Sequence, residues 1–149
     1  MKLSTRSRYG TRALIDIAMN ANGKPVLLRD VARRQAISTM YLEHLITPLI
    51  SAGIIRTTRG AKGGVWLARD PQEITLTEII RLLEGSMAPV ECVDDPKYCA
   101  RCDSCVTRDV WIDLKKAMTG VLDSTTLGDL VEREKQKMAE APEAGMYFI

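Results

Sequence analysis

Residues 38–68 read S-T-M-Y-L-E-H-L-I-T-P-L-I-S-A-G-I-I-R-T-T-R-G-A-K-G-G-V-W-L-A, and they decide the fold because a helical pattern is followed at once by a hairpin pattern. The first part places four apolar residues on one helical stripe: Leu42, Leu45, Ile46 and Leu49. This spacing predicts a helix over 39–51, with Ser38 as its N-cap and a kink near Pro48, which lacks a backbone donor. Strand-like residues 54–58 and 65–68 then flank a basic, glycine-rich tip.

The residues before this stretch add two more helices. Apolar residues recur at helical spacing over 5–21 and again over 27–35. The helices at 27–35 and 39–51, joined by a three-residue turn, predict a helix-turn-helix, and the hairpin that follows is its wing. A further helix is expected over 75–84, ending at Gly85.

Beyond residue 105 the apolar residues form a seam broader than one small core needs. Its members are Val110, Trp111, Leu114, Ala117, Met118, Val121 and Leu122. We interpret this seam as a dimerisation helix, with packing inside a single chain as the alternative. The predicted fold is therefore mainly α with a small β-hairpin: a winged helix-turn-helix plus a long C-terminal dimerisation helix.

The same patterns divide the chain into four parts. We expect a winged helix-turn-helix DNA-binding domain over 1–85, a cysteine-rich loop over 86–106, dimerisation helices over 107–138, the last of them short, and a C-terminal tail over 139–149.

All four cysteines, Cys92, Cys99, Cys102 and Cys105, lie within fourteen residues of one another. Thiolates gathered this tightly can converge on one metal centre, and C-x2-C-x2-C resembles the short loops that hold iron–sulfur clusters. Zinc is the nearest competitor, although structural zinc sites more often pair two C-x2-C knuckles across a longer spacer. A pair of disulfides is the third reading. We expect the loop to be mobile when no metal is bound, because few of its residues are apolar.

Charge and composition restrict the possible functions of this 149-residue chain. Residues 1–71 carry twelve Lys and Arg against four Asp and Glu, whereas residues 72–149 carry nine against fifteen. A basic first half predicts a polyanion partner. The sequence has neither an apolar leader nor an apolar stretch long enough to span a membrane, so we expect a cytoplasmic protein. An enzyme is not expected, because His44 is the one histidine and neither a dinucleotide-binding nor a P-loop motif is present.

The predicted contacts to double-stranded DNA lie on the second helix of the helix-turn-helix and on the wing. Glu43 could accept a hydrogen bond from cytosine in the major groove, and Arg59 at the tip could enter the minor groove. Ser38, Thr39, Met40 and His44 complete the predicted helix face. The predicted phosphate contacts are Arg6, Arg8, Arg33 and Lys62.

Four motifs in this order resemble the Rrf2 family of bacterial transcription regulators, to which the iron–sulfur cluster assembly regulator belongs. They are M-K-L-S-T-R-S-R-Y-G, I-S-T-M-Y-L-E-H-L, R-G-A-K-G-G-V-W-L and C-x6-C-x2-C-x2-C followed by a W-x-x-L helix. The resemblance implies a homodimer that binds a pseudo-palindromic operator and changes its affinity with the state of a bound cluster. It also implies that Tyr41 lies at the DNA.

The chain departs from this family at two positions. Arg108 stands where the cluster assembly regulator has a histidine ligand, and Arg8 stands where nitric-oxide-sensing members are expected to have a ligating aspartate. Four cysteines would then have to hold the cluster, and the resemblance favours [2Fe-2S] slightly over [4Fe-4S]. The alternatives are a regulator that senses through metal-free thiols and a zinc-stabilised regulator. An iron–sulfur electron carrier or enzyme is less favoured.

Overall fold

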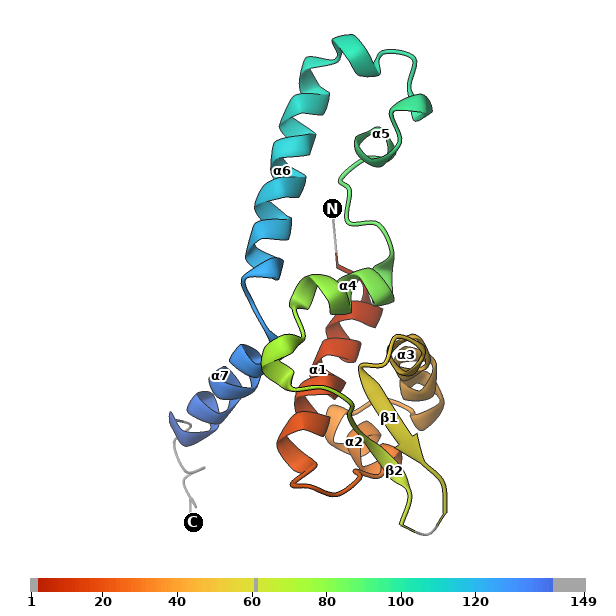
Figure 1. Cartoon of the computed structure of the whole chain (residues 1–149), viewed down its shortest axis with the longest axis vertical. Coiled ribbons are helices and arrows are strands. Elements are labelled where there is room, and N and C mark those ends of the chain that lie inside the picture. Colours follow the sequence, from red (N-terminus) through yellow and green to blue (C-terminus); the bar gives the residue numbers. More distant parts are fainter. Residues whose placement is uncertain (1–2, 61, 141–149) are drawn as a thin grey trace, which may run out of the picture.

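The computed structural model describes residues 3–60 and 62–140. The larger helices are α1 (Thr5–Asn20), α2 (Leu28–Gln35), α3 (Thr39–Ser51), α4 (Leu76–Glu84), α6 (Val106–Asp123) and α7 (Leu127–Glu140). One short helix, α5 (Glu91–Asp94), and two strands, β1 (Ile55–Thr58) and β2 (Gly64–Leu67), lie between them (Figure 1). The predicted fold class is confirmed: the chain is mostly helical with one small antiparallel hairpin. None of the described helices has the length and hydropathy required to cross a membrane.

Most of the core lies between residues 13 and 83, and Leu127 of α7 completes it. Helix α1 runs through its middle, with α2, α3 and α4 packed around it (Figure 1). The stripe predicted for residues 39–51 faces inward, and α1 contributes Leu14 and Ile17, both fully buried. Burying one such aliphatic side chain stabilises the folded state by roughly 1.5–3 kcal/mol. Packing against this core therefore holds α3 in position.

The hairpin is attached to this core at its base. Ile55 lies opposite Leu67, and Thr58 lies opposite Gly64 near the tip. Val65 also pairs with Val26, whose amide donates to the Val65 carbonyl at 2.8 Å. At Gly64 a Cβ atom would lie 2.5 Å from the Val26 carbonyl oxygen, so this close approach requires glycine.

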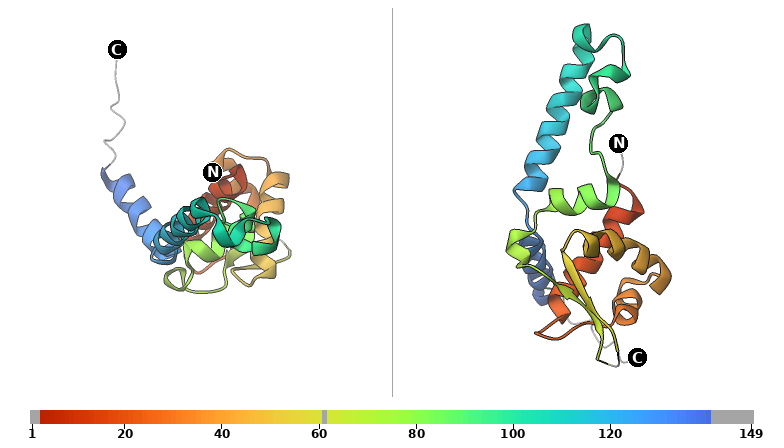
Figure 2. Two further views of the ribbon diagram at one scale, coloured as in Figure 1. Left: turned by 90° about the horizontal axis from the view of Figure 1, so that it is seen from above. Right: turned by 45° about the vertical axis from the view of Figure 1, so that its right-hand side comes forward.

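The second half projects from this body. Helix α6 extends away from it, and the cysteine segment, residues 86–105, lies at the end of the molecule opposite the wing (Figure 2). No residue of α6 is buried. The chain then returns, because Leu127 donates its backbone N–H to the Ile74 carbonyl at 2.8 Å and α7 packs beside α1.

Most predicted element bounds agree with the structure to within one or two residues, but two features differ. Helix α7 is longer than the expected short helix. The cysteine segment contains α5 and two 3-10 turns, Pro96–Tyr98 and Cys102–Ser104, where a loop was expected. Pro48 lies inside α3, which continues to Ser51, and the kink near it stays a prediction. The part of the predicted tail at 141–149 lies outside the described residues.

Candidate nucleic-acid interface and cysteine cluster

The outward face of α3 carries the predicted base-reading residues. The Ser38 hydroxyl accepts a hydrogen bond from the Tyr41 amide at 3.1 Å, so it caps the helix as predicted. Thr39, Met40, Glu43 and His44 are all exposed, and Met40 is 70% exposed. Met40 is apolar, yet no part of the described chain covers its side chain. The structure thus presents all four on one surface.

Thr47 also belongs to this exposed face and was not predicted. It lies one turn beyond Glu43, and its hydroxyl donates to the Glu43 carbonyl at 2.7 Å. The i, i+4 spacing from Glu43 is the signal that could have found it.

Tyr41 has a different position from its neighbours. It is half-buried, its ring meets Tyr9 edge-to-face at 6.2 Å, and its hydroxyl lies 3.3 Å from the Thr5 hydroxyl. These contacts fasten the start of α3 to the start of α1. Arg6 and Arg8, two of the predicted phosphate contacts, are exposed on this same end of α1, and the Arg8 guanidinium lies 5.6 Å from the Tyr9 ring.

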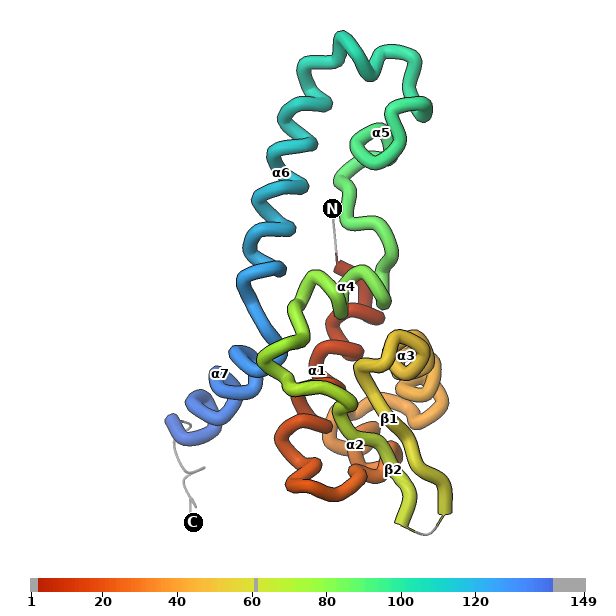
Figure 3. The backbone as a smooth tube through the Cα atoms, viewed as in Figure 1, coloured from red at the N-terminus to blue at the C-terminus, as the bar shows by residue number. Residues whose placement is uncertain are grey.

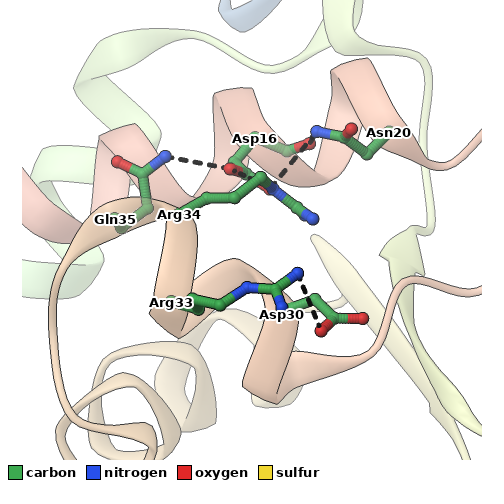
Figure 4. Close-up of polar contacts among 6 residues, drawn as sticks. All are labelled: Asp16, Asn20, Asp30, Arg33, Arg34 and Gln35. Atoms are coloured by element: carbon green, nitrogen blue, oxygen red, sulfur yellow. Dashed lines mark hydrogen bonds and ion pairs between the residues drawn. The ribbon is translucent and has the colours of Figure 1, made fainter.

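A polar network holds α2 against α1 (Figure 4). Asp16 is 6% exposed, and Arg34 donates to its two carboxylate oxygens at 2.9 and 2.5 Å. The hydrogen bond to Asp16 raises the pKa of Arg34 above its ordinary value. Gln35 adds a further hydrogen bond to Asp16 at 2.9 Å. Arg33, by contrast, projects outward with only an exposed pairing to Asp30 at 3.4 Å, so it can reach a phosphate.

The wing carries two cations at its tip. Arg59 and Lys62 are exposed, and neither forms an ion pair with any residue in the described ranges. The Gly63 amide donates to the Gly60 carbonyl at 2.9 Å, so Lys62 lies within this turn and Arg59 directly before it. At Gly63 a Cβ atom would lie 2.5 Å from the Thr58 carbonyl oxygen, which explains why the narrow tip contains glycine.

The four thiols are free and come from different parts of the cysteine segment. Cys92 lies on α5, Cys99 is exposed after the first 3-10 turn, Cys102 is buried on the second, and Cys105 precedes α6. The Cys102 thiol lies 3.9 Å from the Cys92 carbonyl oxygen. Burial raises the pKa of the Cys102 thiol, whereas a hydrogen bond with Thr107 lowers the pKa of Cys105.

Arg108, at the position of the family's histidine ligand, makes a structural contact instead. Its Nε donates to the Cys92 carbonyl at 2.9 Å, which ties α5 to the first turn of α6. Its positive charge also opposes the rise in the pKa of Cys102. The side chain therefore fastens two parts of the segment that carry cysteines.

The donor set matches a thiolate-bound metal centre in its chemistry but not in its arrangement. Four cysteines are the ligand type and number that iron–sulfur clusters require. Across residues 3–60 and 62–140, however, no three Cys, His, Asp or Glu side chains lie close enough to hold a metal ion. Cys99 in particular would have to turn inward for the thiols to converge.

Comparisons with known proteins agree on one family. A family profile described as "Rrf2: Iron-dependent Transcriptional regulator" matches residues 3–133. Protein rrf2 of Nitratidesulfovibrio vulgaris is 47% identical over 131 residues, which cover 88% of this chain and 87% of that protein. The transcriptional regulator CymR of Bacillus subtilis is 38% identical over 149 residues and all of both chains.

Solved structures give the same result. The structure of B. subtilis CymR, titled the global cysteine regulator, has a TM-score of 0.75 at 39% identity and covers 89% of this chain and 98% of its own. The structure of T. potens IscR has a TM-score of 0.74 at 38% identity and covers 99% of this chain and 97% of its own. These relatives are regulators of transcription rather than enzymes.

Proposed function

Because the chain belongs to the Rrf2 family of transcriptional regulators, we propose that it binds operator DNA as a homodimer and that an iron–sulfur cluster on its four cysteines adjusts this binding. The observation that carries the DNA-binding part is the uncovered face of α3 beside a wing whose two cations are unpaired within the described residues. A helix can enter the major groove, and a narrow basic tip suits the minor groove.

The proposed roles follow from position. Thr39, Met40, Glu43 and His44 face the bases, with Glu43 accepting from cytosine. Arg59 enters the minor groove, and Arg6, Arg8, Arg33 and Lys62 contact phosphates. Ser38 and Tyr41 hold the start of α3 through hydrogen bonds inside the chain. We propose that both also lie next to the DNA.

The exposed apolar residues of α6 support the homodimer. Val106, Val110 and Val121 are 78%, 58% and 65% exposed, and Trp111 is 37% exposed. A helix that has no fully buried residue in its own chain but carries such exposed apolar residues is well suited to packing against a second copy. Two-fold symmetry would then duplicate the half-site, so the proposed operator is pseudo-palindromic.

The cluster proposal rests on the donor set and on the iron-dependent description of the family profile. Cys92, Cys99, Cys102 and Cys105 would hold the cluster, with [2Fe-2S] slightly preferred over [4Fe-4S]; it would supply an iron centre whose state depends on redox conditions or iron supply. The chain's own contribution would be to bring the four thiols together and to keep α5 against α6 through Arg108. Reordering of this segment could change the spacing of the two recognition helices.

A metal-free thiol regulator is the second candidate. No three donor side chains in the described residues lie close enough to hold a metal ion, which favours this candidate. A second argument is the structure of Staphylococcus aureus CymR, which is 37% identical to this chain and was solved in an oxidized form. The reactive thiols would be Cys99, which is exposed, and Cys105, whose pKa is lowered by its hydrogen bond with Thr107. A zinc-stabilised segment is a third arrangement of the same donors.

Anaerobic isolation separates these candidates. We expect iron and sulfide in the isolated protein and visible absorption that Cys92→Ala and Cys105→Ala each reduce strongly. Ser104→Ala is the matched control, because it lies in the same segment and removes no thiol. Full retention of the absorption by both cysteine variants, or stoichiometric zinc without iron, would eliminate the cluster. Operator binding that responds to thiol oxidants in protein free of metal would support the second candidate.

A further inference from the structure

The joint between α4 and the cysteine segment also touches the DNA-binding helices. Glu84 is the last residue of α4, and its carboxylate oxygen accepts two hydrogen bonds from Ser4, one from the amide at 2.9 Å and one from the hydroxyl at 2.6 Å. Ser4 is the N-cap of α1. A carboxylate at this position satisfies a free backbone donor and complements the positive end of the helix. Glu84 therefore anchors the start of α1.

The start of α1 is in turn joined to the recognition helix α3. Thr5, the next residue, meets the Tyr41 hydroxyl at 3.3 Å, and Tyr9 packs edge-to-face on the Tyr41 ring. Tyr41 lies in the first turn of α3, between the exposed residues Met40 and Glu43. A displacement of the first turn of α1 would thus reach the base-reading face directly.

On its other side, Glu84 is one residue away from the cysteine segment. Gly85 has φ +85° and ψ −124°, a conformation open essentially to glycine, so the chain turns sharply there. Beyond it, the Ser86 hydroxyl bonds the Asp94 carboxylate, and Asp94 also pairs with Lys115 of α6. Residues 86–94 are therefore tied to α6 as one unit, and Figure 3 shows this part of the chain leaving α4 beside the start of α1.

We propose that Glu84 is the positioning residue through which the state of the cysteine segment reaches the recognition helix. This rests on the proposed function, since it supplies the route by which that regulation acts. When residues 86–94 move, the turn at Gly85 draws Glu84 away from Ser4. The first turn of α1 then loses its anchor, and Tyr41 loses its fixed partner.

The test compares the response of variants rather than their affinity alone. Operator affinity is measured for the full chain with its thiols reduced and again after all four have been alkylated with N-ethylmaleimide, a reagent that perturbs the segment without any metal. Hydrogen exchange of residues 4–9 and 39–44 is followed in the same two states. The variants are Glu84→Ala and Glu84→Gln, with Glu73→Ala as control, because Glu73 is an exposed carboxylate outside the joint.

In the wild type and in Glu73→Ala, we expect alkylation to change operator affinity by about tenfold, within the usual range of coupling between sites. The change in hydrogen exchange should extend to the starts of α1 and α3. In Glu84→Ala the affinity ratio should fall to nearly one, and the exchange change should stay within residues 86–105. Glu84→Gln should keep part of the response, because its amide oxygen still accepts from Ser4. Simple loss of stability would weaken both states alike and leave the ratio unchanged.

The possible failures are distinct. If Glu84→Ala kept the affinity ratio of the wild type, and the change in hydrogen exchange still reached α1 and α3, the role of Glu84 would be overturned. The proposed regulation would remain. A spread of exchange to α1 and α3 that depends on Glu84, with no change in affinity, would retain the coupling and remove the proposed regulation. The absence of both responses in the wild type would overturn both proposals.

Discussion

The two halves of this chain stabilise themselves in different ways. Residues 3–83 enclose a core of fully buried side chains, including Leu14, Leu49 and Ile79. Helix α6 buries none, and Cys102 is the one buried residue between 86 and 123. The core thus lies mostly within residues 3–83, with Leu127 at the start of α7 completing it, whereas α6 and the cysteine segment offer apolar and thiol groups that a second copy and a metal could cover. A regulator needs this contrast, because a sensor that is rigid by itself has no second state to adopt.

The largest expected effect tests the packing of the core. Leu14→Ala removes a fully buried side chain from α1 and should lower the free energy of unfolding by about 2–5 kcal/mol, as cavity-forming changes usually do. Denaturant unfolding should show this loss at every protein concentration.

Val121→Asp is the counterpart on α6, where the side chain is 65% exposed. Its loss of stability should appear only at concentrations where the wild type forms dimers, which analytical ultracentrifugation would define. A concentration-independent loss of similar size for both variants would contradict the contrast between the halves.

The difference between the halves also explains which features the sequence could predict. Leu42, Leu45, Ile46 and Leu49 face the core of their own chain, so their helical spacing alone indicates both the helix and its buried side. The wing was predictable because its turn favours glycine at residues 60 and 63. Requirements of this kind can be recognised from residues that lie close together in the sequence.

The cysteine segment was predicted less well because its structure depends on contacts distant in the sequence. Its helical turns are held by Arg108 on the Cys92 carbonyl and by Lys115 on Asp94. Neither pairing has a periodic signal. The contact between Ser4 and Glu84 spans 80 residues and could not be found from spacing at all. The predicted DNA-facing residues needed only the helix and hairpin, whereas the arrangement of the thiols needed the whole chain.

Arg59→Ala should have the next largest effect, on DNA binding. Removing the exposed cation at the wing tip should weaken binding to every operator sequence by on the order of 2 kcal/mol, as expected for the loss of a charged hydrogen-bonding group. Fluorescence anisotropy with several duplexes would measure it. Lys97→Ala, an exposed cation in the cysteine segment, is the control and should bind as the wild type does. Equal losses for the two variants would show that only net charge matters and that the wing has no special place.

Glu43→Ala should act more narrowly. It removes a proposed acceptor for cytosine from the exposed face of α3, so discrimination should relax at one position of each half-site by roughly 1–3 kcal/mol. Selection from a randomised operator library would reveal the change. An unaltered sequence preference would remove Glu43 from the residues that read bases.

The smallest expected effect concerns the contact between Ser4 and Glu84, where the DNA-binding part meets the cysteine segment. Burial alone would raise the pKa of Glu84, but hydrogen bonds from Ser4 and a polar contribution from Ser7 outweigh it and hold the pKa below its ordinary 4.5. The Ser7 hydroxyl is buried and forms no hydrogen bond of ordinary length in the described residues, so we assign the larger part to Ser4. A group with a lowered pKa in the folded state adds stability above its unfolded pKa and loses it as the pH falls through the folded value.

Glu84→Gln should therefore be less stable than the wild type near neutral pH and should approach the wild-type stability as the pH falls through the lowered pKa of Glu84. Thermal unfolding across this range would measure the difference. Asp129→Asn is the control for a carboxylate of lowered pKa in the last part of the described chain, remote from the joint. It should reproduce the acid dependence while leaving exchange at residues 4–9 unchanged, whereas Glu84→Gln should alter both. A stability difference for Glu84→Gln that stays constant with pH would mean that the Glu84 charge does not anchor α1.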